Sequence, residues 1–235
     1  METFYVKLLT QVPRLHLWAA SCFHLNAPVG WQVENLTRPL RSPPVVVREV
    51  EQDEMITEYY AVNPYSERDV PDHTDGQPVK RLYHRGQGHS GRWPVDCVTC
   101  GRDVASFLHS LRVGVTESGK ISATTTPTSG CSTPPCLQWR DVLVLYSPCM
   151  RYNSGVVTGL REAGIPVRVI KDADIEDVAT ARSDVVWVAD GRRVRRLERK
   201  VVVCLQDPMF YLYTSPRLDL MSRCMSQLVI VSHDH

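Results

Sequence analysis

The chain has 235 residues, 43% of them hydrophobic, and a formal net charge of +1 at pH 7. This length and apolar content allow a sizeable buried core, which excludes wholesale disorder. A free-standing nucleic-acid-binding protein is usually more basic, so any contact with nucleic acid must depend on local basic patches. Every apolar run is shorter than the ~18 residues of a membrane span, and the N-terminal segment makes a poor signal peptide.

The eight cysteines are irregularly spaced, and most stand alone or beside apolar runs that resemble buried strands. Secreted domains of modest size use regularly placed cysteines as a disulfide framework, whereas cytosolic and nuclear proteins keep their thiols reduced. We therefore expect an intracellular protein, nuclear or cytoplasmic.

The N-terminal half predicts a strand over 14–20 and a helix from Pro44 through 54, since proline is tolerated in a first helical turn. Residues 52–80 are rich in Asp, Pro and Tyr, which is typical of a long loop. An edge strand is predicted over 80–85, and 3.6-residue apolar spacing predicts a helix over 100–113.

Residues 114–138 are rich in Ser, Thr, Pro and Gly and predict a linker or a disordered insertion. Within it, Gly114 to Lys120 fits the first seven positions of a phosphate-binding P-loop. That loop needs a preceding strand and a Ser or Thr directly after the Lys, but a helix precedes it and Ile121 follows the Lys. The segment is therefore interpreted as a linker.

The C-terminal half alternates apolar runs without polar alternation, typical of strands buried on both faces, with helical segments. Gly164 is expected to end the first of these helices. This alternation predicts an α/β fold with one parallel sheet. The predicted strands span 141–147, 165–172, 184–190, 200–207 and 227–232, and the predicted helices span 153–163, 174–182 and 215–225.

Three ordered motifs carry a resemblance to superfamily 1 helicases of the UvrD/Rep type. The segment 36–44 reads LTRPLRSPP and resembles their L-x-x-N-Y-R-S motif. The segment 184–203 contains a strand, a turn and Leu-Glu, similar to their K-G-L-E motif. The segment 220–231 reads LMSRCMSQLVIV and resembles their final A-x-[ST]-R-[AC] motif with its strand.

The resemblance covers residues 15–235 and implies the C-terminal RecA-like domain of such a helicase. This is a three-layer α/β domain of the P-loop NTPase type that lacks a P-loop of its own. Residues 1–14 would be a lead-in, and 52–79 and 114–139 would be loop insertions. The implied partners are a separate P-loop domain that binds ATP and Mg²⁺, and single-stranded DNA or RNA, so the chain alone should be inactive.

Residue by residue, the resemblance gives Arg41 and Arg223 to the γ-phosphate of ATP and Glu198 to the nucleotide sugar. Arginine suits the first role because its fixed fork of donors matches a phosphoryl group as negative charge develops. Arg192, Arg193 and Arg195 belong to a basic turn between two strands, placed where helicases touch the nucleic-acid backbone.

Three positions depart from the family pattern. Pro39 replaces the family's Asn, Leu40 replaces the aromatic residue that would stack on adenine, and Arg196 replaces the glycine before Leu-Glu. A large side chain there would crowd backbone that approaches the ligand closely. A non-catalytic, helicase-derived interaction module therefore stays open as an alternative.

Cys97 and Cys100 form a C-x-x-C motif, with His84 and His89 upstream. One such motif is half of a zinc site, and the two histidines could complete it. A single C-x-x-C at the start of a helix is more often a pair of ordinary thiols, which is the interpretation the sequence favours. A zinc-stapled binding domain remains a further alternative.

Overall fold

The computed structural model describes most of the chain's regular elements, and two units are distinguished, residues 1–36 and 37–235. Gln11 is the one residue of the first unit that the structure describes, so the fold given below is that of the second unit. None of the helices described is both long and apolar enough to cross a lipid bilayer. The described residues of the second unit are 41–52, 75–113, 137–146, 154–171, 174–191, 194, 197–206 and 220–233.

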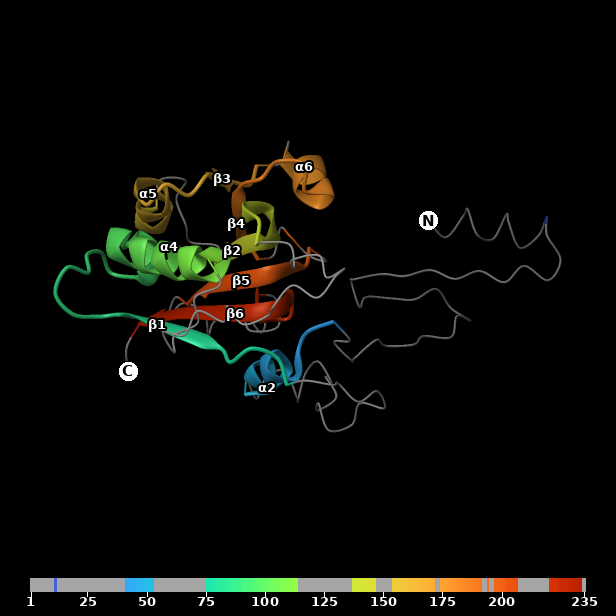
Figure 1. Cartoon of the computed structure of the whole chain (residues 1–235), viewed down its shortest axis with the longest axis horizontal. Coiled ribbons are helices and arrows are strands. Elements are labelled where there is room, and N and C mark those ends of the chain that lie inside the picture. The colour runs from blue at the N-terminus through green and yellow to red at the C-terminus, as the bar shows by residue number, and fades with distance from the viewer. Residues whose placement is uncertain are drawn as a thin grey trace, which may run out of the picture. The chain divides into compact units, whose positions relative to one another are not determined.

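The described residues form six strands in one sheet, in the order β1-β6-β5-β2-β4-β3, and every neighbouring pair is parallel (Figure 1). The prediction of an α/β fold with a parallel sheet is therefore confirmed, including the edge position of β1. The strands are β1 (Lys80–His84), β2 (Val142–Tyr146), β3 (Val167–Val169), β4 (Val186–Asp190), β5 (Arg199–Leu205) and β6 (Cys224–His233).

Successive residues of the central strands enter two different hydrophobic clusters, one on each face of the sheet. In β4, Val186 and Val188 belong to one cluster, whereas Trp187 and Ala189 belong to the other. Side chains alternate between the faces of a strand, so a strand covered on both faces must be apolar throughout. This explains why the apolar runs of the sequence show no polar alternation.

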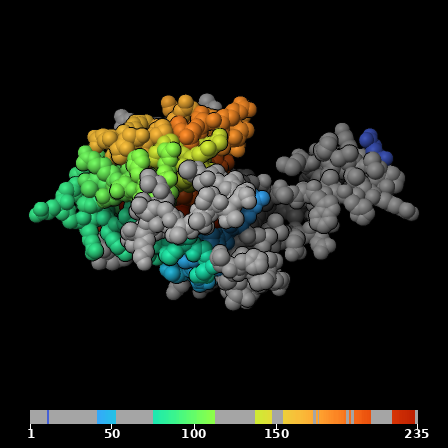
Figure 2. Space-filling model, in the orientation of Figure 1, coloured from blue at the N-terminus to red at the C-terminus, as the bar shows by residue number. Residues whose placement is uncertain are grey.

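Helices lie on both faces and complete three layers. On one face pack α4 (Val98–Val113) and α5 (Gly155–Glu162), while α2 (Pro44–Glu51) and α6 (Ile175–Thr180) add apolar side chains to the cluster of the other. Figure 1 shows α4 and α2 on opposite sides of β5 and β6. In Figure 2 the green surface of α4 adjoins the yellow surface of α5.

The close packing of α4 on α5 depends on glycines. A Cβ atom added to Gly159 would lie 2.1 Å from the carbonyl oxygen of Val98, and one added to Gly101 would lie 2.4 Å from that of Val156. Both distances are far inside van der Waals contact, so the two backbones touch at these positions. This contact fixes α4, and with it the C-x-x-C motif at the start of that helix.

The ends of α5 follow local sequence rules. The Ser154 hydroxyl accepts a hydrogen bond from the Val157 amide at 3.4 Å. Gly164 adopts φ 79°, and its amide donates to the Arg161 carbonyl at 2.9 Å, while the Ile165 amide donates to that of Leu160 at 3.1 Å. This pair of bonds is a Schellman motif, which confirms that Gly164 ends the helix.

Some predicted bounds differ from the structure. The helix predicted over 215–225 ends earlier than predicted, because Cys224 already pairs with Arg199 in the sheet. Strand β3 is shorter than the predicted 165–172, since it is an edge strand with one neighbour. The strand predicted over 14–20 lies outside the described residues, as do residues 114–136 of the predicted linker.

We predict that Gly159→Ala lowers the free energy of unfolding by about 1–3 kcal/mol, although alanine is the better helix former, because the added methyl group forces α4 and α5 apart. Urea denaturation followed by circular dichroism measures the change. Thr158→Ala is the matched control on the exposed side of α5 and should change the stability by only a few tenths of a kcal/mol. Equal stability of the two variants would contradict this packing.

Candidate functional site

The amino ends of β5 and β6 bring together the three segments that resemble helicase motifs. Arg199 and Cys224 pair across these strands. A guanidinium nitrogen of Arg41 lies 2.8 Å from a carboxylate oxygen of Glu198, 157 positions away. The Ser42 hydroxyl donates to the Ser222 carbonyl at 2.8 Å. We call Arg41, Ser42, Glu198, Ser222 and Arg223 the arginine corner.

Arg41 and Glu198 form an accessible ion pair. The Arg41 side chain is 75% exposed, and that of Glu198 is 31% exposed. An exposed pair of this kind contributes about 0–1 kcal/mol, so its geometry can change at little cost. Arg41 can therefore exchange the carboxylate for another anion brought to this surface.

Arg223 has a different environment, because its residue is only 6% exposed. Its guanidinium donates to the carbonyl of Val194 at 2.6 Å and to that of Gly191 at 3.1 Å. Both carbonyls belong to the connection 191–198. Hydrogen bonds from a charged donor to buried carbonyls are strong, so Arg223 holds this connection in place.

The connection 191–198, predicted as a basic turn between two strands, is a crossover between strands that are not neighbours in the sheet. Strand β2 lies between β4 and β5, and all three are parallel. The chain must therefore return along the sheet from the carboxyl end of β4 to the amino end of β5. Within this connection, Val194 is 3% exposed and packs in the hydrophobic cluster on the face that α2 and α6 cover.

The basic run is only partly described. Arg192, Arg193 and Arg195, the predicted nucleic-acid contacts, lie outside the described residues. At its end, Arg199 donates to the carbonyls of Val178 and Glu198, and burial lowers the pKa of Arg199. Lys200 Nζ lies 3.0 Å from Asp141 Oδ2. These last two cations of the run are thus engaged within the molecule.

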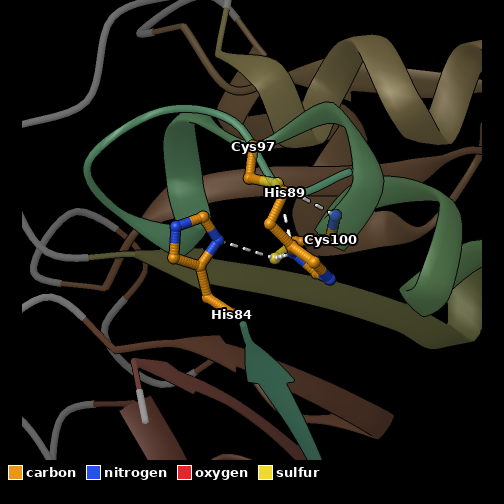
Figure 3. Close-up of side chains that lie close together, drawn as sticks. All are labelled: His84, His89, Cys97 and Cys100. Atoms are coloured by element: carbon orange, nitrogen blue, oxygen red, sulfur yellow. Dashed lines mark hydrogen bonds between the residues drawn. The ribbon is translucent and has the colours of Figure 1, made fainter. Parts of the chain in front are cut away.

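A second group of chemically active side chains contains His84, His89, Cys97 and Cys100, which we call the His/Cys cluster (Figure 3). One nitrogen or sulfur atom from each residue lies within 4.8 Å of the others. His84 Nδ1 is 3.3 Å from Cys100 Sγ. His89 Nδ1 is 3.4 Å from Cys100 Sγ and 3.5 Å from Cys97 Sγ. The sequence grouped the same four residues as a candidate zinc site, which it favoured less than two ordinary thiols.

Two regular elements and one loop position the cluster. His84 is the last residue of β1, and Cys97 and Cys100 lie at the start of α4. The loop between them supplies His89. Gly91 adopts φ 88°, a conformation that favours glycine, and lets the chain pass close to Asp96, where a Cβ atom would be 2.9 Å from Asp96 Cβ.

Contacts around the cluster orient both histidines. His84 makes a backbone hydrogen bond with Gly91, and burial lowers the pKa of His84, which favours the neutral ring. His89 Nε2 lies 3.8 Å from a carboxylate oxygen of Asp103, so His89 Nδ1 faces the sulfurs. Burial, followed by the neighbouring Cys97, raises the pKa of the Cys100 thiol.

Comparisons with known proteins give partial structural likenesses. No family model and no curated protein match the chain. Among matching solved structures is one described as the C-terminal domain of a possible DNA helicase from Lactobacillus plantarum WCFS1, with a TM-score of 0.31 and 16% identity. The match covers 40% of this chain and 56% of that one. The chain thus spans little more than half the length of that structure.

Sequence reasoning missed Gly91 and Asp103 at the cluster and the buried contacts of Arg223. Asp103 could have been found, because it follows Cys100 by three positions and so shares its side of α4. Nothing in the sequence indicated the role of Arg223 on the crossover, since its two acceptors are backbone carbonyls of another segment.

We expect Arg223→Met to lower the free energy of unfolding by about 3 kcal/mol, because two buried carbonyls lose their donors. Chemical denaturation gives the value. Arg102→Met is the control, since Arg102 pairs with Glu162 at 2.7 Å on the exposed surface and should contribute about 0–1 kcal/mol. If the two variants were equally stable, Arg223 would not hold the crossover.

Proposed function

We propose that this chain acts as the C-terminal RecA-like domain of a superfamily 1 helicase, and that it supplies Arg41 to ATP bound on a separate P-loop domain. The observation that carries the proposal is the contact between Arg41 and Glu198. It joins two motif segments that are distant in sequence, at the place where β5 and β6 begin. The parallel three-layer fold is of the kind the proposal requires.

Arg41 has the chemistry that the role needs. Its guanidinium is exposed and already held by a carboxylate, so it can turn to a phosphoryl group when a partner domain closes. Glu198, released from Arg41, can then accept a hydrogen bond from a sugar hydroxyl. ATP and Mg²⁺ would be held by the partner domain, and this chain would stabilise the charge that develops on the transferred group.

In the same proposal, Arg192, Arg193 and Arg195 bind the phosphate backbone of single-stranded DNA or RNA. Guanidinium groups suit this task because they pair with phosphate oxygens regardless of base sequence. The net charge of the chain is close to zero, so binding would be confined to this basic run.

A specific observation favours a second candidate, a helicase-derived interaction module without catalysis. Arg223, the second arginine assigned to phosphate by resemblance, donates to two carbonyls inside the fold. A domain in which this arginine is structural retains one of the two catalytic arginines. The module would keep the fold and its surface for binding, but would not respond to ATP.

ATP hydrolysis separates these candidates. We expect no turnover by the isolated chain, with or without single-stranded DNA. When a P-loop domain that associates with the chain is added, the helicase candidate predicts ATPase activity that falls by about 10³-fold or more in Arg41→Ala. The control Arg48→Ala removes another exposed arginine, on α2, and should leave the rate unchanged.

ATPase activity that is insensitive to Arg41→Ala favours the interaction module. Robust turnover by the isolated chain, abolished by Lys120→Ala, would overturn both candidates, because it would mean that residues 114–120 form a functional P-loop after all.

The nucleic-acid role predicts salt-dependent binding of a fluorescent oligo(dT) strand, measured by anisotropy. Replacing Arg192, Arg193 and Arg195 by Ala should lower the slope of log K against log salt by up to about 2, at about 0.7 for each single-strand phosphate contact. The control replaces Arg102, Arg161 and Arg168, which changes the net charge equally. Equal loss of affinity in both triple variants would contradict a local binding site.

A further inference from the structure

We propose that His84, His89, Cys97 and Cys100 bind one Zn²⁺ ion in a structural Cys₂His₂ site that ties the edge strand β1 to helix α4. The sequence alone favoured two ordinary thiols. The geometry of the four side chains changes that balance. This site is independent of the proposed helicase role, because it shares no residue with the arginine corner.

The distances between the ligand atoms fit a tetrahedron around zinc. With Zn–S near 2.3 Å and Zn–N near 2.0–2.1 Å, the nitrogen-to-sulfur edges of a tetrahedral site are about 3.5 Å. Three of the four nitrogen-to-sulfur distances in the cluster are 3.3, 3.4 and 3.5 Å, and all four ligand atoms lie within 4.8 Å of one another. Both nitrogens are Nδ1 atoms that face the sulfurs, as Figure 3 shows. One ion at the centre would therefore reach all four ligands with little rearrangement.

The kind of ligand selects zinc among the common metals. Two cysteine sulfurs with two imidazole nitrogens in a tetrahedral arrangement are typical of Zn²⁺, whereas Mg²⁺ and Ca²⁺ require oxygen ligands. The Cys100 amide lies 3.4 Å from Cys97 Sγ and donates to it. This hydrogen bond, and the position of Cys97 directly before the amino end of α4, place partial positive charge beside Cys97 Sγ.

The surrounding contacts are those of a metal site. Histidines that bind a metal commonly give their second nitrogen to a carboxylate or to a backbone carbonyl, which fixes the orientation of the ring. An Asp103 carboxylate oxygen lies 3.8 Å from Nε2 of His89, within ion-pair distance, and His84 makes a hydrogen bond with the backbone of Gly91. Thr99 adds a hydrogen bond from its hydroxyl to the Gly88 carbonyl at 2.5 Å, which fastens the loop to α4.

The site has a structural rather than a catalytic arrangement. Four protein ligands fill a tetrahedral zinc ion, leaving no position for a substrate or water. His84, Cys97 and Cys100 are 6%, 0% and 1% exposed, so the centre would be shielded from solvent. A closed and buried site of this type contributes to folding.

The position of the cluster shows what the zinc ion would stabilise. Among the strands that the structure describes, β1 lies at the edge of the sheet and pairs with β6 alone. The loop after it contains glycines with positive φ at 86, 88 and 91, which favour the unfolded chain through their backbone freedom. A metal that joins the end of β1, the loop and the start of α4 offsets this entropy by linking three segments.

The direct test is the metal content of the full chain purified without chelator from zinc-supplemented medium. We expect about one zinc per chain by mass spectrometry. After removal of the metal, addition of Co²⁺ should give the intense visible bands of a tetrahedral site and thiolate-to-metal charge transfer in the near ultraviolet. Chelation should lower the thermal unfolding midpoint by several degrees, and Zn²⁺ should restore it.

Variants locate the site. The double variant Cys97→Ser, Cys100→Ser should lose the zinc and the cobalt spectrum. Its matched control is Cys204→Ala, Cys224→Ala, which also removes two buried free cysteines but belongs to the opposite face of the sheet, and should keep one zinc. If either double variant fails to fold, His89→Gln gives the same test with a less buried ligand, and we expect at least a tenfold loss of zinc affinity.

Three outcomes would overturn the proposal. The first is wild-type protein with neither zinc nor a tetrahedral cobalt spectrum. The second is zinc that remains after replacement of Cys97 and Cys100. The third is a disulfide between these two cysteines, revealed when the denatured wild-type chain shows two fewer free thiols than its eight cysteines while the Cys97→Ser, Cys100→Ser variant shows all of its thiols free.

Discussion

The parallel direction of all six strands is the constraint on which the rest of this structure depends. Each strand must be followed by a segment that returns to the opposite end of the sheet, and these segments cover both faces. Helices α4 and α5 provide such cover on one face. Between β4 and β5 the return is the short connection 191–198, and its described residues show no helix. A helix would satisfy backbone carbonyls with its own hydrogen bonds; here Arg223 donates to the carbonyls of Gly191 and Val194 instead.

The same constraint separates the two candidate sites. Segments that directly precede parallel strands meet at the amino ends, which is why Glu198, before β5, and Arg223, before β6, lie together. Arg41 precedes α2 and joins them through its ion pair with Glu198. The His/Cys cluster forms at the carboxyl end of β1, where the chain leaves the sheet for α4. The amino ends and the carboxyl ends of the parallel strands thus carry different side chains. The amino end carries Arg41, Arg199 and Arg223, and the carboxyl end of β1 combines sulfur and imidazole groups.

Most of the fold followed from the sequence because its strands are buried on both faces and its helices keep a regular apolar spacing. The run 184–190 was predicted as a strand for this reason, and β4 confirms it with side chains in both clusters. The sequence indicated the four residues of the His/Cys cluster, but it favoured two ordinary thiols over a zinc site. The C-x-x-C spacing is local, whereas the approach of His84 and His89 depends on the path of the loop and on β1 joining the sheet.

The two arginines carried over by resemblance look equivalent in the sequence, and their surroundings separate them. To reach a phosphate, Arg41 must leave one exposed carboxylate, which costs about 0–1 kcal/mol. Arg223 must leave two buried carbonyls, and each hydrogen bond from a charged donor contributes about 1.5–3 kcal/mol, before the carbonyls themselves are counted. Moving Arg223 to a phosphate therefore costs several kcal/mol more than moving Arg41, and a new exposed ion pair, at about 0–1 kcal/mol, would not offset that cost. If this fold acts on a nucleotide, Arg41 is therefore the residue that moves, and Arg223 is the residue that keeps the corner in shape.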